Sequence, residues 1–158
     1  MDELRDLYQE VILDHGRNPR NCRHLEHASC RAQGNNPMCG DRVTVYLTLD
    51  GDGTIEDAAF EGRGCAISMA SASMMTEVLK GKTARDADRL FEAFQALCTG
   101  EAEDLAAVAE SDPDAAERLL ALSGVRAFPV RVKCATLPWH TMKAAVAGGS
   151  DQEVTTEV

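Results

Sequence analysis

The sequence lacks three features that mark large classes of protein: a long apolar run, an excess of basic residues and an apolar N-terminus. No stretch reaches the roughly 18 uninterrupted apolar residues of a membrane span, so we expect no membrane association. The 16 basic and 26 acidic residues give a net charge of -10, which repels phosphate backbones and argues against a nucleic acid partner. The charged start MDELRDLYQE differs from a signal peptide, so we expect a cytoplasmic protein.

The sequence also lacks any CxxC pair, although it has six cysteines, at positions 22, 30, 39, 65, 98 and 134. An exported protein would join such cysteines in disulfides, whereas cytosolic cysteines stay reduced. Reduced thiols serve metal binding, sulfur chemistry or core packing. Because no CxxC pair is present, spacing alone does not choose between a metal site and buried cysteines.

The chain has 158 residues, enough for one domain. We expect that domain to span residues 1–147. Its acidic and alanine-rich part, about 99–124, predicts a helical insertion. Residues 148–158 show no apolar periodicity, which predicts a disordered tail.

The expected secondary structure combines helices with a small sheet. Alternating apolar and polar residues predict a strand over 42–49, and a DGDG turn leads to a second strand over 54–60. We also expect an edge strand over 28–33. Apolar spacings of three and four predict helices near 4–12, directly after Cys65, from Thr83, and from about Pro129 to Ala147. The predicted fold class is α+β, with a small antiparallel sheet of about three strands packed against helices.

Three cysteines lie at a predicted turn or helix start: Cys39 in NPMCGD, Cys65 after GRG, and Cys134 in the opening turns of the last helix. A helix N-terminus favours the thiolate, which is the form that binds metal and attacks sulfur. Three thiolates and Asp41 match the number and type of ligands that zinc prefers, and the same thiolates suit iron-sulfur clusters. Packing of buried thiols is the alternative for each cysteine.

A family resemblance is carried by four segments: LYQEVILDHGRNPRN, NPMCGD, FEGRGCAISMASASMMTEVLKGK and RVKCATLPW. Together they resemble the U-type iron-sulfur cluster assembly proteins, the group of IscU, SufU and the NifU N-terminal domain, across nearly the whole chain. Cluster scaffolds of the IscU type carry a histidine where this chain has Lys133, and an LPPVK chaperone-recognition stretch where it reads AFPVRVK. These differences and the long segment before Cys134 make the chain more similar to the SufU branch.

The resemblance implies that Cys39, Asp41, Cys65 and Cys134 bind one zinc ion. It further implies a sulfur-transfer cycle with a SufS-type, pyridoxal-phosphate-dependent cysteine desulfurase. In that cycle a desulfurase histidine replaces Cys39 on zinc, and the freed Cys39 thiolate takes the persulfide sulfur.

Two alternatives use the same residues. In the first, the protein is a scaffold that builds a transient 2Fe-2S cluster, or holds iron, and passes its cargo to downstream iron-sulfur assembly or acceptor proteins. In the second, it is a purely structural zinc domain. Asp41 favours an exchangeable site, because a metal that prefers sulfur binds a carboxylate less tightly than a cysteine thiolate.

Three thiolates and one carboxylate exceed the charge of a divalent cation, so we expect a basic residue beside them. Arg131 lies one helical turn before Cys134, from where its guanidinium can donate to a thiolate or carboxylate. We therefore expect Arg131 to act with Cys39 as a catalytic residue, the alternative being an ordinary solvated arginine. The cysteines at 22, 30 and 98 match no motif position, and we expect core packing or chance exposure for them.

Overall fold

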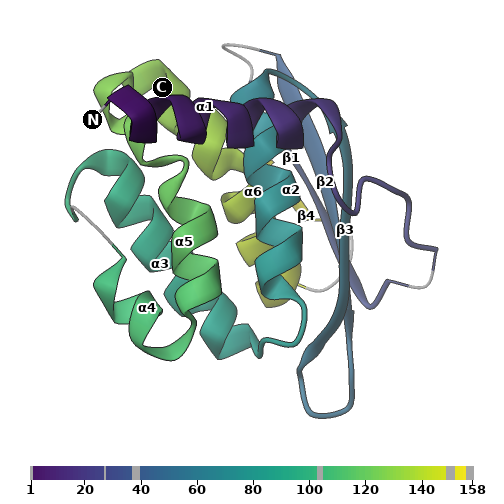
Figure 1. Cartoon of the computed structure of the whole chain (residues 1–158). Coiled ribbons are helices and arrows are strands. Elements are labelled where there is room, and N and C mark those ends of the chain that lie inside the picture. Colours follow the sequence, from purple (N-terminus) through teal and green to yellow (C-terminus); the bar gives the residue numbers. More distant parts are fainter. Residues whose placement is uncertain (1, 27, 37–39, 103–104, 149–151, 156–158) are drawn as a thin grey trace.

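The structure is a computed structural model of the chain, and it describes residues 2–26, 28–36, 40–102, 105–148 and 152–155 (Figure 1). Its elements, in chain order, are α1 (Asp2–Arg17), β1 (Cys30–Asn36), β2 (Asp41–Leu49), β3 (Ile55–Arg63), α2 (Ala66–Leu79), α3 (Ala84–Thr99), α4 (Ala106–Ser111), α5 (Pro113–Leu120), the 3-10 helix η1 (Ser123–Ala127), α6 (Pro129–Gly148) and β4 (Gln152–Thr155).

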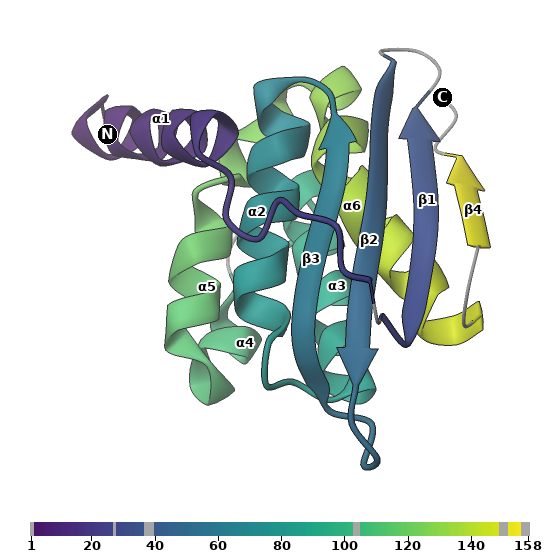
Figure 2. The same ribbon diagram turned by 90° about the vertical axis from the view of Figure 1, so that its right-hand side faces the viewer.

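The strands form one sheet in the order β3-β2-β1-β4 (Figure 2). β1, β2 and β3 pair antiparallel, which confirms the predicted sheet. β4 pairs in parallel with the other edge of β1. The sequence predicts a disordered tail over 148–158, and the structure instead has β4 within it. An unpaired strand edge offers backbone hydrogen bonds to any nearby segment, and local periodicity does not reveal such long-range pairing.

The helices cover one face of the sheet (Figure 2). α6 packs on β1 and β2, α2 packs on β3, and α3 packs against α6 from outside. The core between these layers contains Phe60 of β3, Met74 of α2 and Trp139 of α6, all fully buried. The Trp139 ring stacks on Phe94 of α3, with the two ring centroids 5.0 Å apart. This arrangement confirms the α+β fold class.

Across the part of the chain that the structure describes, no helix combines the length and the apolar character needed to cross a membrane.

Two helix starts follow the capping residues of the sequence. The side chain of Thr83 accepts a hydrogen bond from the backbone N of Asp86, at 3.2 Å, and begins α3 as predicted. The side chain of Asp112 accepts one from the backbone N of Ala115, at 3.1 Å, directly before α5. The segment predicted as a helical insertion, about 99–124, contains α4, α5 and the start of η1.

The position of α6 depends on two close contacts. A Cβ atom at Gly34 of β1 would overlap the Thr141 hydroxyl and lie 3.2 Å from the Thr141 Cβ, so the missing side chain lets α6 approach the sheet. On its other side, the Ser71 hydroxyl of α2 donates to the backbone carbonyl of Ala135. These contacts fix α6 against both the sheet and α2.

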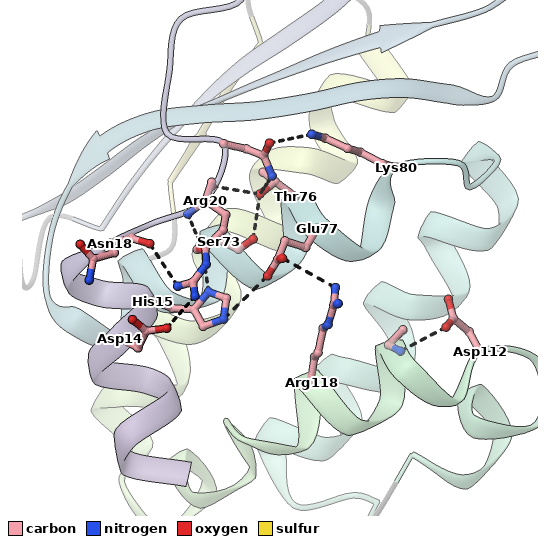
Figure 3. A network of polar contacts seen from close by, with 12 residues as sticks. Asp14, His15, Asn18, Arg20, Ser73, Thr76, Glu77, Lys80, Asp112 and Arg118 are labelled. Atoms are coloured by element: carbon pink, nitrogen blue, oxygen red, sulfur yellow. Dashed lines mark hydrogen bonds and ion pairs between the residues drawn. The ribbon is translucent and has the colours of Figure 1, made fainter. Parts of the chain in front are cut away.

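α1 and the residues that follow it are held to α2 by a polar cluster that we call the α1 network (Figure 3). His15 Nδ1 lies 2.7 Å from the hydroxyl of Ser73, and the backbone N of Arg20 donates to the same hydroxyl at 2.8 Å. His15 Nε2 lies 3.7 Å from Glu77, and Arg118 of α5 lies 3.8 Å from the other Glu77 oxygen. His15 and Ser73 are buried, so the network ties α1 to α2 from inside.

Candidate metal centre

Strand pairing brings Asp41 and Cys65 together. Asp41 is the first residue of β2, and β3 ends at Arg63, which lies opposite Arg42. Because the strands are antiparallel, the start of β2 lies beside the chain that leaves β3. Asp41 is 1% exposed, and its Oδ1 accepts a hydrogen bond from the backbone N of Cys65 at 2.9 Å.

Cys65 is the N-cap residue of α2, which confirms the predicted helix start. Its backbone is extended, and its Sγ accepts a hydrogen bond from the backbone N of Ser68 at 3.5 Å. The unpaired N–H groups of a helix start favour negative charge on the cap. Sγ also lies 3.8 Å from Oδ2 of Asp41. Cys65 therefore faces the carboxylate from the N-terminus of α2.

Cys134 reaches the same point from the opening turns of α6. Its side chain is fully buried, and its Sγ, the Cys65 Sγ and a carboxylate oxygen of Asp41 all lie within 4.8 Å of one another. Burial, followed by a hydrogen bond to Asp41 and the proximity of Cys65, raises the pKa of the Cys134 thiol. We call these three side chains, Asp41, Cys65 and Cys134, the thiol-carboxylate cluster.

Arg131 lies at the edge of this cluster. The thiols of Cys134 and Cys65 near its guanidinium raise the pKa of Arg131. The structure thus places Arg131 within reach of two of the predicted ligands, one helical turn before Cys134. Its role in catalysis stays a prediction.

Cys39 lies outside the residues that the structure describes, so its predicted roles as ligand and sulfur acceptor stay predictions. Of the residues around it, Asn36 ends β1 and Gly40 precedes Asp41. The backbone N of Gly40 donates to the carbonyl of Asn36 at 2.8 Å, and Gly40 has a φ of 76°. This left-handed conformation favours glycine at the position directly before Asp41.

The other cysteines lie away from the cluster. Cys30 and Cys98 are buried and Cys22 is exposed, which agrees with the expected core packing or chance exposure. Burial raises the pKa of Cys98 to about 12. Within the described ranges, the thiol-carboxylate cluster is the one group of three or more possible metal ligands whose atoms lie this close together.

The donor atoms of the cluster fit a zinc ion. Tetrahedral zinc with sulfur at about 2.3 Å and oxygen at about 2.0–2.2 Å places its ligand atoms roughly 3.5–3.8 Å apart. The Cys65 Sγ to Asp41 Oδ2 distance of 3.8 Å meets this requirement. The three ligand atoms all lie within 4.8 Å of one another, and a small side-chain movement would bring them to the separations that zinc needs. Three residues leave a fourth position for another ligand. Thiolate donors also suit iron-sulfur clusters.

Three residues around the cluster were not predicted to position it. Ser68 supplies the N–H that faces Cys65, Ser71 ties α2 to α6, and Gly64 contacts the carboxylate of Asp41. Of these, Ser68 could have been found from its place three residues after a capping side chain. Ser71 and Gly64 act through tertiary contacts, which local sequence patterns do not predict.

The fold and the cluster together define the class: an α+β protein whose thiol and carboxylate groups gather where the sheet meets the starts of two helices. The particular family follows from comparison with known proteins. Residues 7–135 match the NifU-like N-terminal domain family, so the chain belongs to that family. This match confirms the resemblance that its sequence segments carry.

Individual relatives resemble the chain over most of its length. It is 44% identical over 144 residues to the zinc-dependent sulfurtransferase SufU of Bacillus subtilis (strain 168), covering 91% of this chain and 92% of that protein. It is 36% identical over 157 residues to the iron-sulfur cluster assembly scaffold protein IscU of Streptococcus pyogenes serotype M1, covering 99% and 93%. A crystal structure from Fervidobacterium islandicum AW-1, of a proposed iron-sulfur cluster assembly scaffold protein for the SUF system, matches with a TM-score of 0.76 and 34% identity, covering 87% and 94%.

Proposed function

We propose that this protein acts in iron-sulfur cluster assembly as a zinc-dependent sulfurtransferase, accepting persulfide sulfur from a SufS-type cysteine desulfurase on Cys39. The observation that carries the proposal is the convergence of Asp41, Cys65 and Cys134, whose atoms lie within 4.8 Å of one another. The 44% identity to a zinc-dependent sulfurtransferase supports the same chemistry. We place the activity in the cytoplasm, where thiols stay reduced.

Each residue of the cluster has a distinct part. Zinc bound by Cys39, Asp41, Cys65 and Cys134 would keep the thiols deprotonated at neutral pH. Cys65 and Cys134 are the anchors, because one caps α2 and the other is buried in α6. Asp41 is the one oxygen ligand among three thiolates, and its weaker bond to the metal keeps the site exchangeable. The Arg131 guanidinium, which lies near Cys134 and Cys65, offsets negative charge.

The transfer step itself is a thiol exchange at sulfur. The Cys39 thiolate attacks the outer sulfur of a persulfide on the desulfurase, and a new sulfur-sulfur bond forms on Cys39. The original sulfur-sulfur bond breaks, and the desulfurase cysteine leaves as a thiolate. Since one persulfide replaces another, the step needs no oxidant or reductant.

An exposed apolar pair beside the cluster supports a protein partner. Phe128 is 57% exposed and directly precedes α6, and Val130 is 71% exposed and lies in the first turn of α6, directly before Arg131. Large apolar side chains on a surface are typical of sites that another protein covers. A desulfurase docked on this pair would bring its persulfide to the edge of the thiol-carboxylate cluster.

The proposal is tested by sulfur transfer from a purified desulfurase to the zinc-loaded protein. We expect the wild-type protein to accelerate cysteine turnover and to gain one sulfur atom by mass spectrometry. Cys39→Ala should abolish both effects, whereas Cys22→Ala, which removes an exposed cysteine of no motif, should leave them unchanged. Equal acceleration by Cys39→Ala would refute the proposed role.

A scaffold function is the second candidate, supported by the 36% identity to an IscU scaffold protein. In that case the same thiolates would hold a transient 2Fe-2S cluster for delivery to acceptor proteins. Anaerobic reconstitution with iron and sulfide should then give a stable visible chromophore that an apo-ferredoxin takes up. If no transferable chromophore forms and Cys39 still accepts sulfur, the scaffold function is refuted and the sulfurtransferase function stands.

A further inference from the structure

Gly64, the residue before Cys65, lies against the carboxylate of Asp41. A Cβ atom added at Gly64 would lie 2.8 Å from the Asp41 Cγ, 3.2 Å from its Cβ and closer still to Oδ1. Contacts under about 3.0 Å between such atoms are repulsive, since carbon atoms in contact prefer separations of about 3.5–4.0 Å. The carboxylate of Asp41 therefore occupies space that any side chain at position 64 would need.

The contact is confined to one side chain. Gly64 does not have a left-handed φ, so alanine can adopt its backbone conformation. By contrast, a Cβ at Gly62 would meet the backbone of Arg42, including its carbonyl carbon at 3.2 Å. A methyl group at position 62 would push two strands apart, whereas one at position 64 would displace a carboxylate.

That carboxylate is held in one orientation by what surrounds it. Oδ1 accepts the hydrogen bond from the Cys65 backbone N at 2.9 Å, and Oδ2 faces the Cys65 Sγ at 3.8 Å. Asp41 is 1% exposed, so it has no solvent to turn into without movement of its neighbours. Displacing Oδ1 from Gly64 would break the bond to Cys65 and move Oδ2 relative to the sulfur.

We propose that Gly64 is a positioning residue for the metal centre: its missing side chain leaves the space in which Asp41 lies, and so sets the carboxylate among the ligands. This inference rests on the proposed function, because it assigns Asp41 to the metal. Gly64→Ala should then act on the site through Asp41 alone, and its effect should vanish when Asp41 is absent.

The first test measures zinc affinity by competition with a chromophoric chelator. We expect Gly64→Ala to weaken zinc binding about 10- to 100-fold, the range seen when residues that orient a metal ligand are changed. In the Asp41→Ala background the same substitution should change the affinity less than about twofold, since its effect passes through Asp41. Gly124→Ala is the matched control, because a Cβ there meets nothing within 4 Å. Equal losses in both backgrounds would overturn the inference.

The second test needs no metal. In metal-free protein the amide proton resonance of Cys65 reports its hydrogen bond to Asp41, and Gly64→Ala should move it to the position that it takes in Asp41→Ala. An unmoved resonance would overturn the positioning role even if wild-type protein binds zinc. Failure of the wild-type protein to bind zinc, with the resonance shifted as expected, would instead refute the proposed function and leave the contact between Gly64 and Asp41 intact.

Discussion

Two polar clusters lie along α2, and they differ in the kinds of chemical group that they bring together. In the α1 network the Ser73 hydroxyl meets a ring nitrogen of His15 and a backbone N–H, and Glu77 meets Arg118 (Figure 3). The thiol-carboxylate cluster at the N-terminus of α2 gathers only groups that become anionic when they ionise, with Arg131 at its edge. A network that joins bases to acids serves the fold, whereas a group of two thiols and a carboxylate is suited to a cation.

The largest effect that separates the two clusters should come from Cys134→Ala. It removes a buried ligand atom, so we expect zinc affinity to fall more than about 100-fold, beyond the range for residues that only support a ligand. The free energy of unfolding of metal-free protein should change by less than about 2 kcal/mol, because one small side chain is lost. Chelator competition and urea denaturation measure the two quantities. Unchanged zinc affinity would contradict the claim that the thiol-carboxylate cluster binds metal whereas the α1 network supports the fold.

The converse effect is expected from Ser73→Ala in the α1 network. The substitution leaves the His15 ring nitrogen and the Arg20 N–H without their buried partner, which costs about 1–3 kcal/mol of stability. Zinc affinity should stay within about twofold, since changes at sites that share no contact are usually independent. A large loss of zinc binding with little loss of stability would show that the two clusters are coupled.

A smaller effect should appear in the pH dependence of stability. Burial lowers the pKa of His15 from the ordinary 6.5, and the charge of Arg20 acts in the same direction while Glu77 and Asp14 oppose it. The unfolded chain therefore takes up this proton at higher pH than the folded one. Stability is complete above pH 6.5 and falls as the pH is lowered through the folded pKa.

Urea denaturation of metal-free protein between pH 7.5 and pH 5 measures this dependence, with chelator present throughout. In His15→Asn, which has no ring to protonate, the loss of stability on acidification should be smaller than in the wild-type protein. A weaker loss should remain, because burial also lowers the pKa of His140. Identical pH profiles for the variant and wild type would contradict the buried, neutral state of His15.

The sequence predicts the parts of this molecule that depend on neighbouring residues. Alternation over 42–49 identifies β2, Thr83 identifies the start of α3, and the switch to helical spacing places Cys65 at a helix start. Each of these signals is local, because side-chain periodicity and capping act within a few residues. The motif segments then identify the family, which the match over residues 7–135 confirms.

What the sequence does not predict depends on contacts between distant segments. β4 exists because its residues pair with the edge of β1. Cys134 meets Cys65 because Gly34 and Ser71 fix α6 against the sheet and α2. Such contacts follow from packing of the whole chain rather than from local propensity.

The central claim is that the thiol-carboxylate cluster and Cys39 together hold a metal ion. X-ray absorption at the zinc edge of the zinc-loaded protein tests it most directly, because the fine structure counts sulfur neighbours. We predict three sulfur atoms at about 2.3 Å and one lighter atom for wild type, and two sulfur atoms for Cys39→Ala. A shell of oxygen and nitrogen alone, or a sulfur count that Cys39→Ala leaves unchanged, would contradict the account.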